Sequence, residues 1–221
     1  MNNVIVLFGE ILIVFTLLIL THKFAGEDGV TAWVCVASVL ANIITAKNAD
    51  IFGLSTAIGS VLFASTFLAT DILTECYSAE KARKAVFMGA GATVVFIICS
   101  QIALLYIPSS IDYADGAMRV LFGLNLRISI SSVVMYLVAN LADVWLFDKL
   151  KRKGGKLWVR NNVATITCNC LENLFFVFFA FVGIYPMTDI LIIALSTSII
   201  EALIGVCDTP FIYLARRVGE R

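Results

Sequence analysis

Charged residues are scarce in this sequence: Asp, Glu, Lys and Arg make up 14% of its 221 residues, whereas a typical soluble domain has about 25%. Hydrophobic residues make up 60%, and the mean hydropathy is +0.95. One water-soluble core of this length cannot bury so many apolar side chains, so we expect a lipid bilayer to be the solvent. The net charge is zero, which excludes the basic field typical of nucleic-acid-binding proteins.

Other absences exclude the familiar enzyme classes. The sequence contains no P-loop, no H-E-x-x-H zinc motif and no G-x-S-x-G nucleophile motif. Its six cysteines form no C-x-x-C pair, and most lie in apolar runs, where cysteine behaves as a small hydrophobic residue. We therefore expect no enzyme, no metal and no cofactor, and this chain alone cannot power an ATP-driven pump.

Long apolar runs are abundant instead. A transmembrane helix needs about 20 mainly apolar residues. Seven stretches qualify: 4–21, 30–46, 54–72, 85–106, 128–147, 163–184 and 187–214. The third is the weakest because it is short and rich in Gly, Ser and Thr, and the first is expected to be retained because no Lys or Arg precedes it. The prediction is an all-α, polytopic integral membrane protein whose residues 1–221 form a single transmembrane domain.

The positions of the basic residues test this count. With seven spans and the N-terminus outside, thirteen of the sixteen Lys and Arg residues fall on the cytoplasmic side, as the positive-inside rule predicts. If the third stretch did not cross, the basic loops at 73–84 and 148–162 would lie on opposite faces, and the bias would largely vanish. The sequence therefore predicts seven spans, with the N-terminus outside and the C-terminus inside.

Several of these stretches contain polar side chains. A charge near the bilayer centre costs at least about 2.5–3.5 kcal/mol, so such residues usually have a function. The acids are Glu10, Asp71, Asp143, Glu172, Glu201 and Asp208, and the amides are Asn42, Gln101, Asn140, Asn169 and Asn173.

Their spacing places some of them on common helix faces. Residues three, four or seven apart share a face, as do Asn140 with Asp143, Asn169 with Glu172 and Asn173, and Glu201 with Asp208. Glu172 and Glu201 lie at a similar depth near mid-membrane on consecutive spans. The sequence therefore predicts that these two acids share a cavity.

Structural roles are alternatives for some of the other polar residues. Asn42, Gln101 and Asn140 could each hydrogen-bond a neighbouring helix. Glu10 could face a headgroup or a partner helix, and Asp143 could pair with the nearby basic loop. These alternatives stay open from the sequence alone.

Six short strings occur in a distinctive order along the chain. They are Ala41-Asn-Ile followed by Lys47, Phe67-Leu-Ala-Thr-Asp71-Ile, Asn140-x-x-Asp143-Val with Phe147, Leu157-Trp-Val-Arg-Asn-Asn162, Asn169-x-x-Glu172-Asn173 leading into Ala180-Phe-Val-Gly183, and Asp208-Thr-Pro210. Together they resemble the queuosine precursor transporter family, also called the vitamin uptake transporter family, over about residues 30–215.

The resemblance implies uptake across the cell membrane of a 7-deazaguanine base, such as queuine, preQ1 or preQ0, for salvage into tRNA modification. It also implies a six-helix core at residues 30–215, preceded by one extra span within residues 1–26. Asn140, Glu172 and Asn173 differ from the residues common in the family, and the position of Glu201 is Lys in some relatives. These differences point to a different ligand within the class, for instance the larger base queuine.

A purine-like base of this kind suits buried acids. One carboxylate can accept its adjacent N–H and amino donors, and Asn side chains can complement its carbonyl and ring nitrogen. Queuine and preQ1 also carry a cationic amine. We predict that Glu172 or Glu201 accepts hydrogen bonds from the edge of the base and that the other forms an ion pair with the amine. The predicted substrate site comprises Glu172, Asn173, Glu201, Asn169, Asn140, Asp143, Asn42, Gln101, Asp71 and Asp208.

Two other functions are compatible with the sequence. The chain could be the substrate-binding subunit of an energy-coupling-factor importer, in which Ala37-x-x-x-Ala41 would allow close packing with a partner helix. It could also be a membrane assembly protein without a ligand, whose polar residues only pair helices. A homo-oligomer is left open, and no nucleic acid partner is expected.

Overall fold

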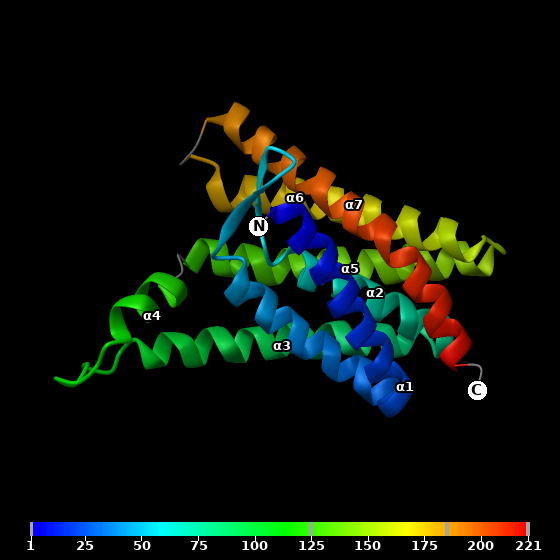
Figure 1. Cartoon of the computed structure of the whole chain (residues 1–221), viewed down its shortest axis with the longest axis horizontal. Helices are drawn as coiled ribbons and strands as arrows, with labels where there is room; N and C mark the ends of the chain where they lie inside the picture. The colour runs from blue at the N-terminus through cyan, green and yellow to red at the C-terminus, as the bar shows by residue number, and fades with distance from the viewer. Residues whose placement is uncertain (1, 124–125, 184–185, 220–221) are drawn as a thin grey trace.

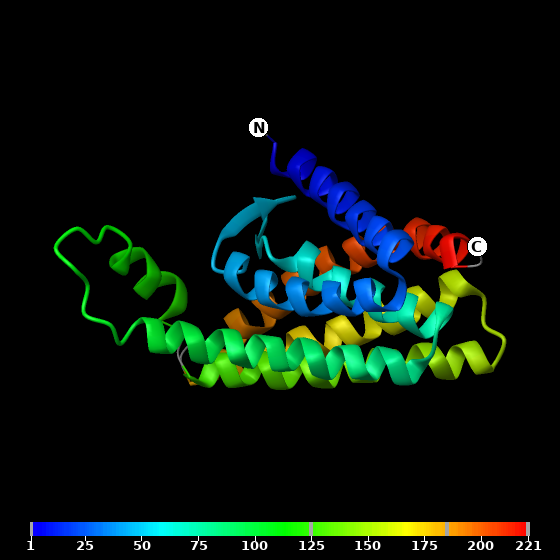
Figure 2. The ribbon, with the colours of Figure 1, turned by 90° about the horizontal axis from the view of Figure 1, so that it is seen from below.

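The protein is a bundle of long helices with one small β-hairpin. The structure is a computed structural model, and it describes residues 2–123, 126–183 and 186–219. The elements are α1 (Asn3–Ile44), β1 (Asn48–Ile51), β2 (Leu54–Ala57), α2 (Ser60–Cys76), α3 (Ala79–Ala103), α4 (Asp115–Phe122), α5 (Leu126–Arg152), α6 (Leu157–Phe181) and α7 (Met187–Gly219). α3 and α5 lie along the long axis of the molecule (Figures 1 and 2).

α1 corresponds to the first two predicted spans. At Gly26 its backbone has φ 56° and ψ −139°, a region open almost only to glycine, and the chain doubles back there (Figures 1 and 2). The first half buries Leu7, Ile11 and Phe15. The centroid of the Phe15 ring lies 5.3 Å from that of Phe211 in α7. α1 is therefore a pair of helices that reverses direction at one residue.

Replacing Gly26 with Ala is expected to destabilise the protein by about 1–3 kcal/mol, because a Cβ disfavours this backbone conformation. Gly9 provides the matched control, since it is helical and open space surrounds its Cβ position. Gly9→Ala is expected to leave the stability unchanged or to raise it. Thermal unfolding of the detergent-purified variants measures both effects, and a wild-type midpoint for Gly26→Ala would contradict the prediction.

A β-hairpin occupies the predicted start of the third span. β1 and β2 pair antiparallel, and the two residues between them, Phe52 and Gly53, both have positive φ, as a type I′ turn requires. The predicted boundary at residue 54 is therefore wrong: residues 54–57 form β2, and the helix begins at Ser60.

α2, the weakest of the predicted spans, is enclosed by other helices. Nearly all of its residues are buried, and it contacts α1, α3, α5 and α7. The hydroxyl groups of Ser65, Thr70 and Thr74 donate to backbone carbonyls three or four residues earlier, which allows them to be buried. Small and polar residues suit a helix that is surrounded by protein rather than by lipid.

The outer faces of the other long helices are apolar. Large hydrophobic side chains are exposed along them, among them Ile13, Val95, Val138 and Leu195. Soluble proteins rarely expose contiguous apolar surface of such extent. Within the described part of the chain, five helices (α1, α3, α5, α6 and α7) are long and apolar enough to cross a membrane. The predicted all-α, polytopic membrane protein is confirmed.

Basic residues gather at one end of the bundle. There Glu75, near the end of α2, meets Lys151 of α5, Arg160 of α6 and Arg216 of α7. We call this the basic end, defined by these four residues. The opposite end, where β1 and β2 lie, is called the hairpin end.

The ion pairs at the basic end bear on the membrane topology. They hold the predicted loops at 73–84 and 148–162 on the same side of the bundle. The seven-span arrangement requires this placement, because α2 must cross between the two ends. The positive-inside rule assigns the basic end to the cytoplasm, and this orientation stays a prediction.

Candidate functional site

A row of polar side chains runs along one face of α6. Asn161, Thr165, Asn169 and Asn173 are spaced by four residues, and all four are buried. Residues four apart lie above one another on a helix, so the row extends about 18 Å. We call this row, together with the acids of α2, α5, α6 and α7 that lie beside it, the polar axis.

Glu172 of α6 and Glu201 of α7 meet on the hairpin side of the polar axis. The Asn173 amide nitrogen donates to Glu201 Oε2 at 2.7 Å, and the Ser60 hydroxyl donates to the same carboxylate. Glu172 is also buried and lies close enough to Glu201 for direct electrostatic repulsion. Two buried acids side by side are costly unless a cation or a proton joins them. We call these two residues the glutamate pair.

Three aspartates meet nearer the basic end. Asp71 of α2, Asp143 of α5 and Asp208 of α7 are all fully buried. The carboxyl groups of Asp71 and Asp143 lie within hydrogen-bonding reach of each other, and Asp208 interacts electrostatically with both. The Asn161 amide nitrogen donates to Asp208 Oδ1 at 2.6 Å, and the Thr165 hydroxyl faces Asp143. We call Asp71, Asp143 and Asp208 the aspartate cluster.

Asn140 and Asn169 lie between these two acidic groups. Asn140 is fully buried, donates to the Tyr136 carbonyl at 3.0 Å, and has its side-chain oxygen 3.4 Å from the Thr66 hydroxyl. Asn169 is buried, and neither of its amide atoms has a hydrogen-bond partner among the residues that the structure describes. Asn169 therefore has an unused donor and an unused acceptor in the middle of the polar axis.

An aromatic ring lies at the same level. Phe67 of α2 is fully buried and packs against Ala139 and Cys168, the chain neighbours of Asn140 and Asn169. The phenylalanines farther along α6 differ, since Phe175 and Phe179 are exposed on the outer surface of the bundle. Phe67 is therefore the better candidate to contact a planar ligand.

An ion network closes the polar axis at the basic end. The Arg160 guanidinium lies 2.5 Å from Glu75 Oε2, and the two side chains are only 8% and 7% exposed. Lys151 Nζ lies 3.4 Å from the same oxygen, and Arg160 stands over the Phe147 ring at 5.2 Å from its centroid. Because Glu75 is one helical turn beyond Asp71, this network lies between the aspartate cluster and the loops at this end of the bundle.

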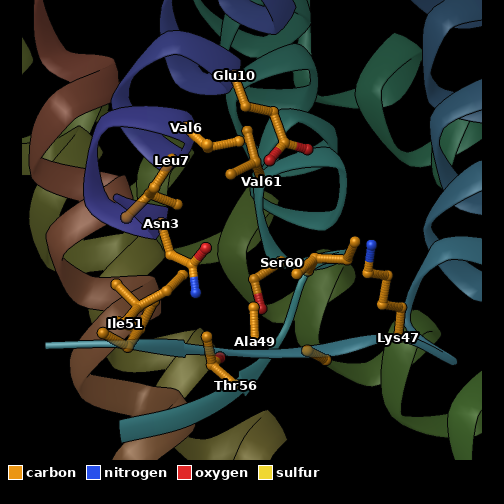
Figure 3. A pocket seen from close by; sticks show the side chains of 13 residues that line it. Asn3, Val6, Leu7, Glu10, Lys47, Ala49, Ile51, Thr56, Ser60 and Val61 are labelled. Atoms are coloured by element: carbon orange, nitrogen blue, oxygen red, sulfur yellow. The ribbon is translucent and has the colours of Figure 1, made fainter. Parts of the chain in front are cut away.

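A cavity of about 150 Å³ lies at the hairpin end. Its walls come from the first half of α1, from the β-hairpin and from the start of α2, and Figure 3 shows Glu10, Lys47 and Ser60 around it. Ser60 and Ile200 line this cavity. Ser60 also hydrogen-bonds Glu201, so this residue connects the cavity to the glutamate pair, although neither glutamate lines the cavity.

Two predicted site residues lie apart from the polar axis. Asn42 donates to the Ser38 carbonyl at 2.8 Å and accepts from the Ser132 hydroxyl at 3.3 Å, which links α1 to α5. Gln101 is exposed and donates to the Phe122 carbonyl of α4 at 2.6 Å. Both contacts fit the structural alternative for these amides.

The sequence analysis missed five residues of the site. They are Ser60, Glu75, Arg160, Asn161 and Thr165. One signal was present in the sequence, since the four-residue spacing from position 161 to position 173 marks a single helix face. The predicted start of the sixth span at residue 163 hid it, because Arg160 and Asn161 were then placed outside the helix.

Comparisons with known proteins agree in pointing to one family. A family model described as "Putative vitamin uptake transporter" matches residues 57–215. A Bacillus subtilis (strain 168) protein named "Probable queuosine precursor transporter" is 31% identical over 207 residues, which cover 92% of this chain and 90% of that protein. The Escherichia coli (strain K12) "Queuosine precursor transporter" is 27% identical over 150 residues, covering 63% of this chain and 64% of that protein. No solved structure matches the chain.

Proposed function

This chain belongs to the vitamin uptake transporter family, and we propose that it imports a 7-deazaguanine precursor of queuosine across the cell membrane. The names of its relatives support this substrate class. The observation in the chain itself that supports it best is the buried glutamate pair, held in place by Asn173 and Ser60.

The glutamate pair suits the two ends of such a base. Asn173 and Ser60 fix the orientation of the Glu201 carboxylate, and a fixed, planar carboxylate can accept two adjacent donors together. Glu201 therefore reads the N–H and amino edge of the base. Glu172 lies beside it and meets the cationic amine, whose charge relieves the repulsion between the two acids.

Neighbouring groups complete the proposed site. The unpartnered amide of Asn169 complements the carbonyl and ring nitrogen of the base. Phe67 offers an apolar contact at the same level. The cavity at the hairpin end provides the approach from outside, since Ser60 lies on its wall and hydrogen-bonds Glu201.

The small residues that could receive a partner helix are already packed within this chain. Ala37 and Ala41, the small residues that could have received a partner helix, are buried inside the chain's own bundle. The Ser38 hydroxyl on the same helix lies 3.3 Å from the Gly89 carbonyl of α3. This close packing is therefore used within the chain, and we propose that the chain transports on its own.

Uptake in a host that can neither make nor import queuosine precursors tests the proposal. Expression of this chain is expected to restore queuosine in tRNA when queuine, preQ1 or preQ0 is supplied, and adenine is not expected to compete. The readout is the queuosine content of isolated tRNA, with empty vector as control. Absence of restoration by all three bases, with the protein present in the membrane, would refute the proposed function.

A further inference from the structure

The aspartate cluster is left unused by the proposed substrate site. Its three side chains come from three helices and are fully buried. The carboxyl groups of Asp71 and Asp143 lie within hydrogen-bonding reach. A hydrogen bond between two carboxyl groups requires that one of them carry a proton, since an ionised carboxylate can only accept.

A second observation is that hydrogen-bond acceptors outnumber donors around the cluster. Asn161 is fully buried and donates its amide N–H to Asp208. Its side-chain oxygen has no donor within the described part of the chain, and the same is true of Asp208 Oδ2. An acidic O–H is the donor that such a site lacks.

The geometry argues for a proton rather than a metal cation. Among the residues described, no group of three Asp, Glu, His or Cys side chains is arranged to hold a metal ion. A chelated cation would need several carboxylate oxygens converging on one point. The contact between Asp71 and Asp143 needs only one hydrogen.

Polar and charged side chains lie on both sides of the aspartate cluster, and a proton could move along them. Asp71 faces Asp143, Asp208 and Arg160, and Cys168 of α6 lies near both Asp71 and Asp143. α1 and α3 bring mostly apolar side chains to the core, such as Val30 and Val86. Their buried polar groups are His22, which contacts Tyr77, and Ser38 and Thr93, which bond the Gly89 carbonyl. The polar axis continues through Asn169 toward the glutamate pair on one side and through Glu75 toward the basic end on the other.

We propose that the aspartate cluster is a proton-binding site that couples substrate import to the proton gradient. A proton arriving from the hairpin end converts one carboxylate of the Asp71–Asp143 pair into the acid. When Glu75 releases Arg160, the guanidinium pairs with Asp71, and the proton leaves toward the basic end. The substrate binds separately, at the glutamate pair, so this inference rests on the proposed function.

Purified protein in liposomes tests the coupling. With an inward proton gradient, labelled queuine is expected to accumulate by up to about tenfold per pH unit for each coupled proton, and a dye inside the liposome should report substrate-dependent acidification. Asp143→Asn and Asp71→Asn are expected to lose this accumulation but to keep exchange of internal for external queuine, which needs no net proton movement. Asp189→Asn, at an exposed position, is the matched control and should behave as wild type.

The possible results distinguish proton coupling from the proposed transport function. Exchange by the wild type without gradient-driven accumulation or acidification would overturn proton coupling and leave the transport function intact. Accumulation driven by sodium alone would also overturn it. Absence of both exchange and accumulation in the wild type would refute the proposed function itself. The wild-type measurements decide the proposal even if an aspartate variant fails to fold, and full coupling in well-folded Asp143→Asn and Asp71→Asn would overturn it.

Discussion

Glu201→Gln is expected to lower the affinity for queuine by about thirtyfold or more, because truncating one partner of a buried charged contact costs about 2–5 kcal/mol. The carboxylate accepts from Asn173 and Ser60 and still has lone pairs for two donors of the base. The amide of Gln would present an N–H group toward these donors instead. Uptake of labelled queuine over a range of concentrations measures the change, and both exchange and accumulation should fall at low queuine concentrations.

Two further variants sharpen this prediction. Glu172→Gln is expected to weaken uptake of queuine and preQ1, whose amine is cationic, more than uptake of preQ0, which lacks the amine. Glu80→Gln makes the same chemical change at an exposed position of α3 and should leave uptake unchanged. Normal queuine uptake by a well-folded Glu201→Gln variant would remove Glu201 from the substrate site.

The membrane class could be predicted from the sequence, because it depends on local patterns. Apolar length predicts which stretches cross, and the distribution of Lys and Arg places the loops of α2 and α5 on one side. The similar depth of Glu172 and Glu201 follows from their positions along consecutive helices. The structure adds the lateral arrangement that brings their side chains together.

The aspartate cluster could not be predicted in this way. Asp71, Asp143 and Asp208 lie on three helices that are far apart in the sequence, and depth alone does not say which helices are neighbours. The central position of α2 could not be predicted, because a helix enclosed by protein contains small and polar residues and therefore has a low hydropathy. The β-hairpin was missed because it depends on Phe52 and Gly53 adopting positive φ, which no long-range pattern marks.

Glu75→Leu is expected to destabilise the protein by about 3 kcal/mol, because breaking a buried ion pair leaves a charge without its partner. The Arg160 side chain is only 8% exposed, and its guanidinium forms an ion pair with the Glu75 carboxylate at 2.5 Å. Asp71 lies close enough to attract the freed guanidinium, which keeps the cost at the lower end of the usual range. The same attraction would hold Asp71 ionised, so the variant is also expected to lose gradient-driven uptake. Thermal unfolding in detergent and accumulation in liposomes measure the two effects.

An exposed ion pair provides the control for this prediction. Glu27 and Lys81 are 2.8 Å apart, but their side chains are 30% and 48% exposed, so Glu27→Leu is expected to cost less than about 1 kcal/mol.

Combining Glu75→Leu with Arg160→Met removes both charges and should recover part of the lost stability, since an apolar pair often replaces a buried ion pair at little cost. Recovered stability without recovered accumulation would show that Arg160 is needed for coupling and not only for folding. Equal destabilisation by Glu27→Leu and Glu75→Leu would contradict the closed ion network at the basic end.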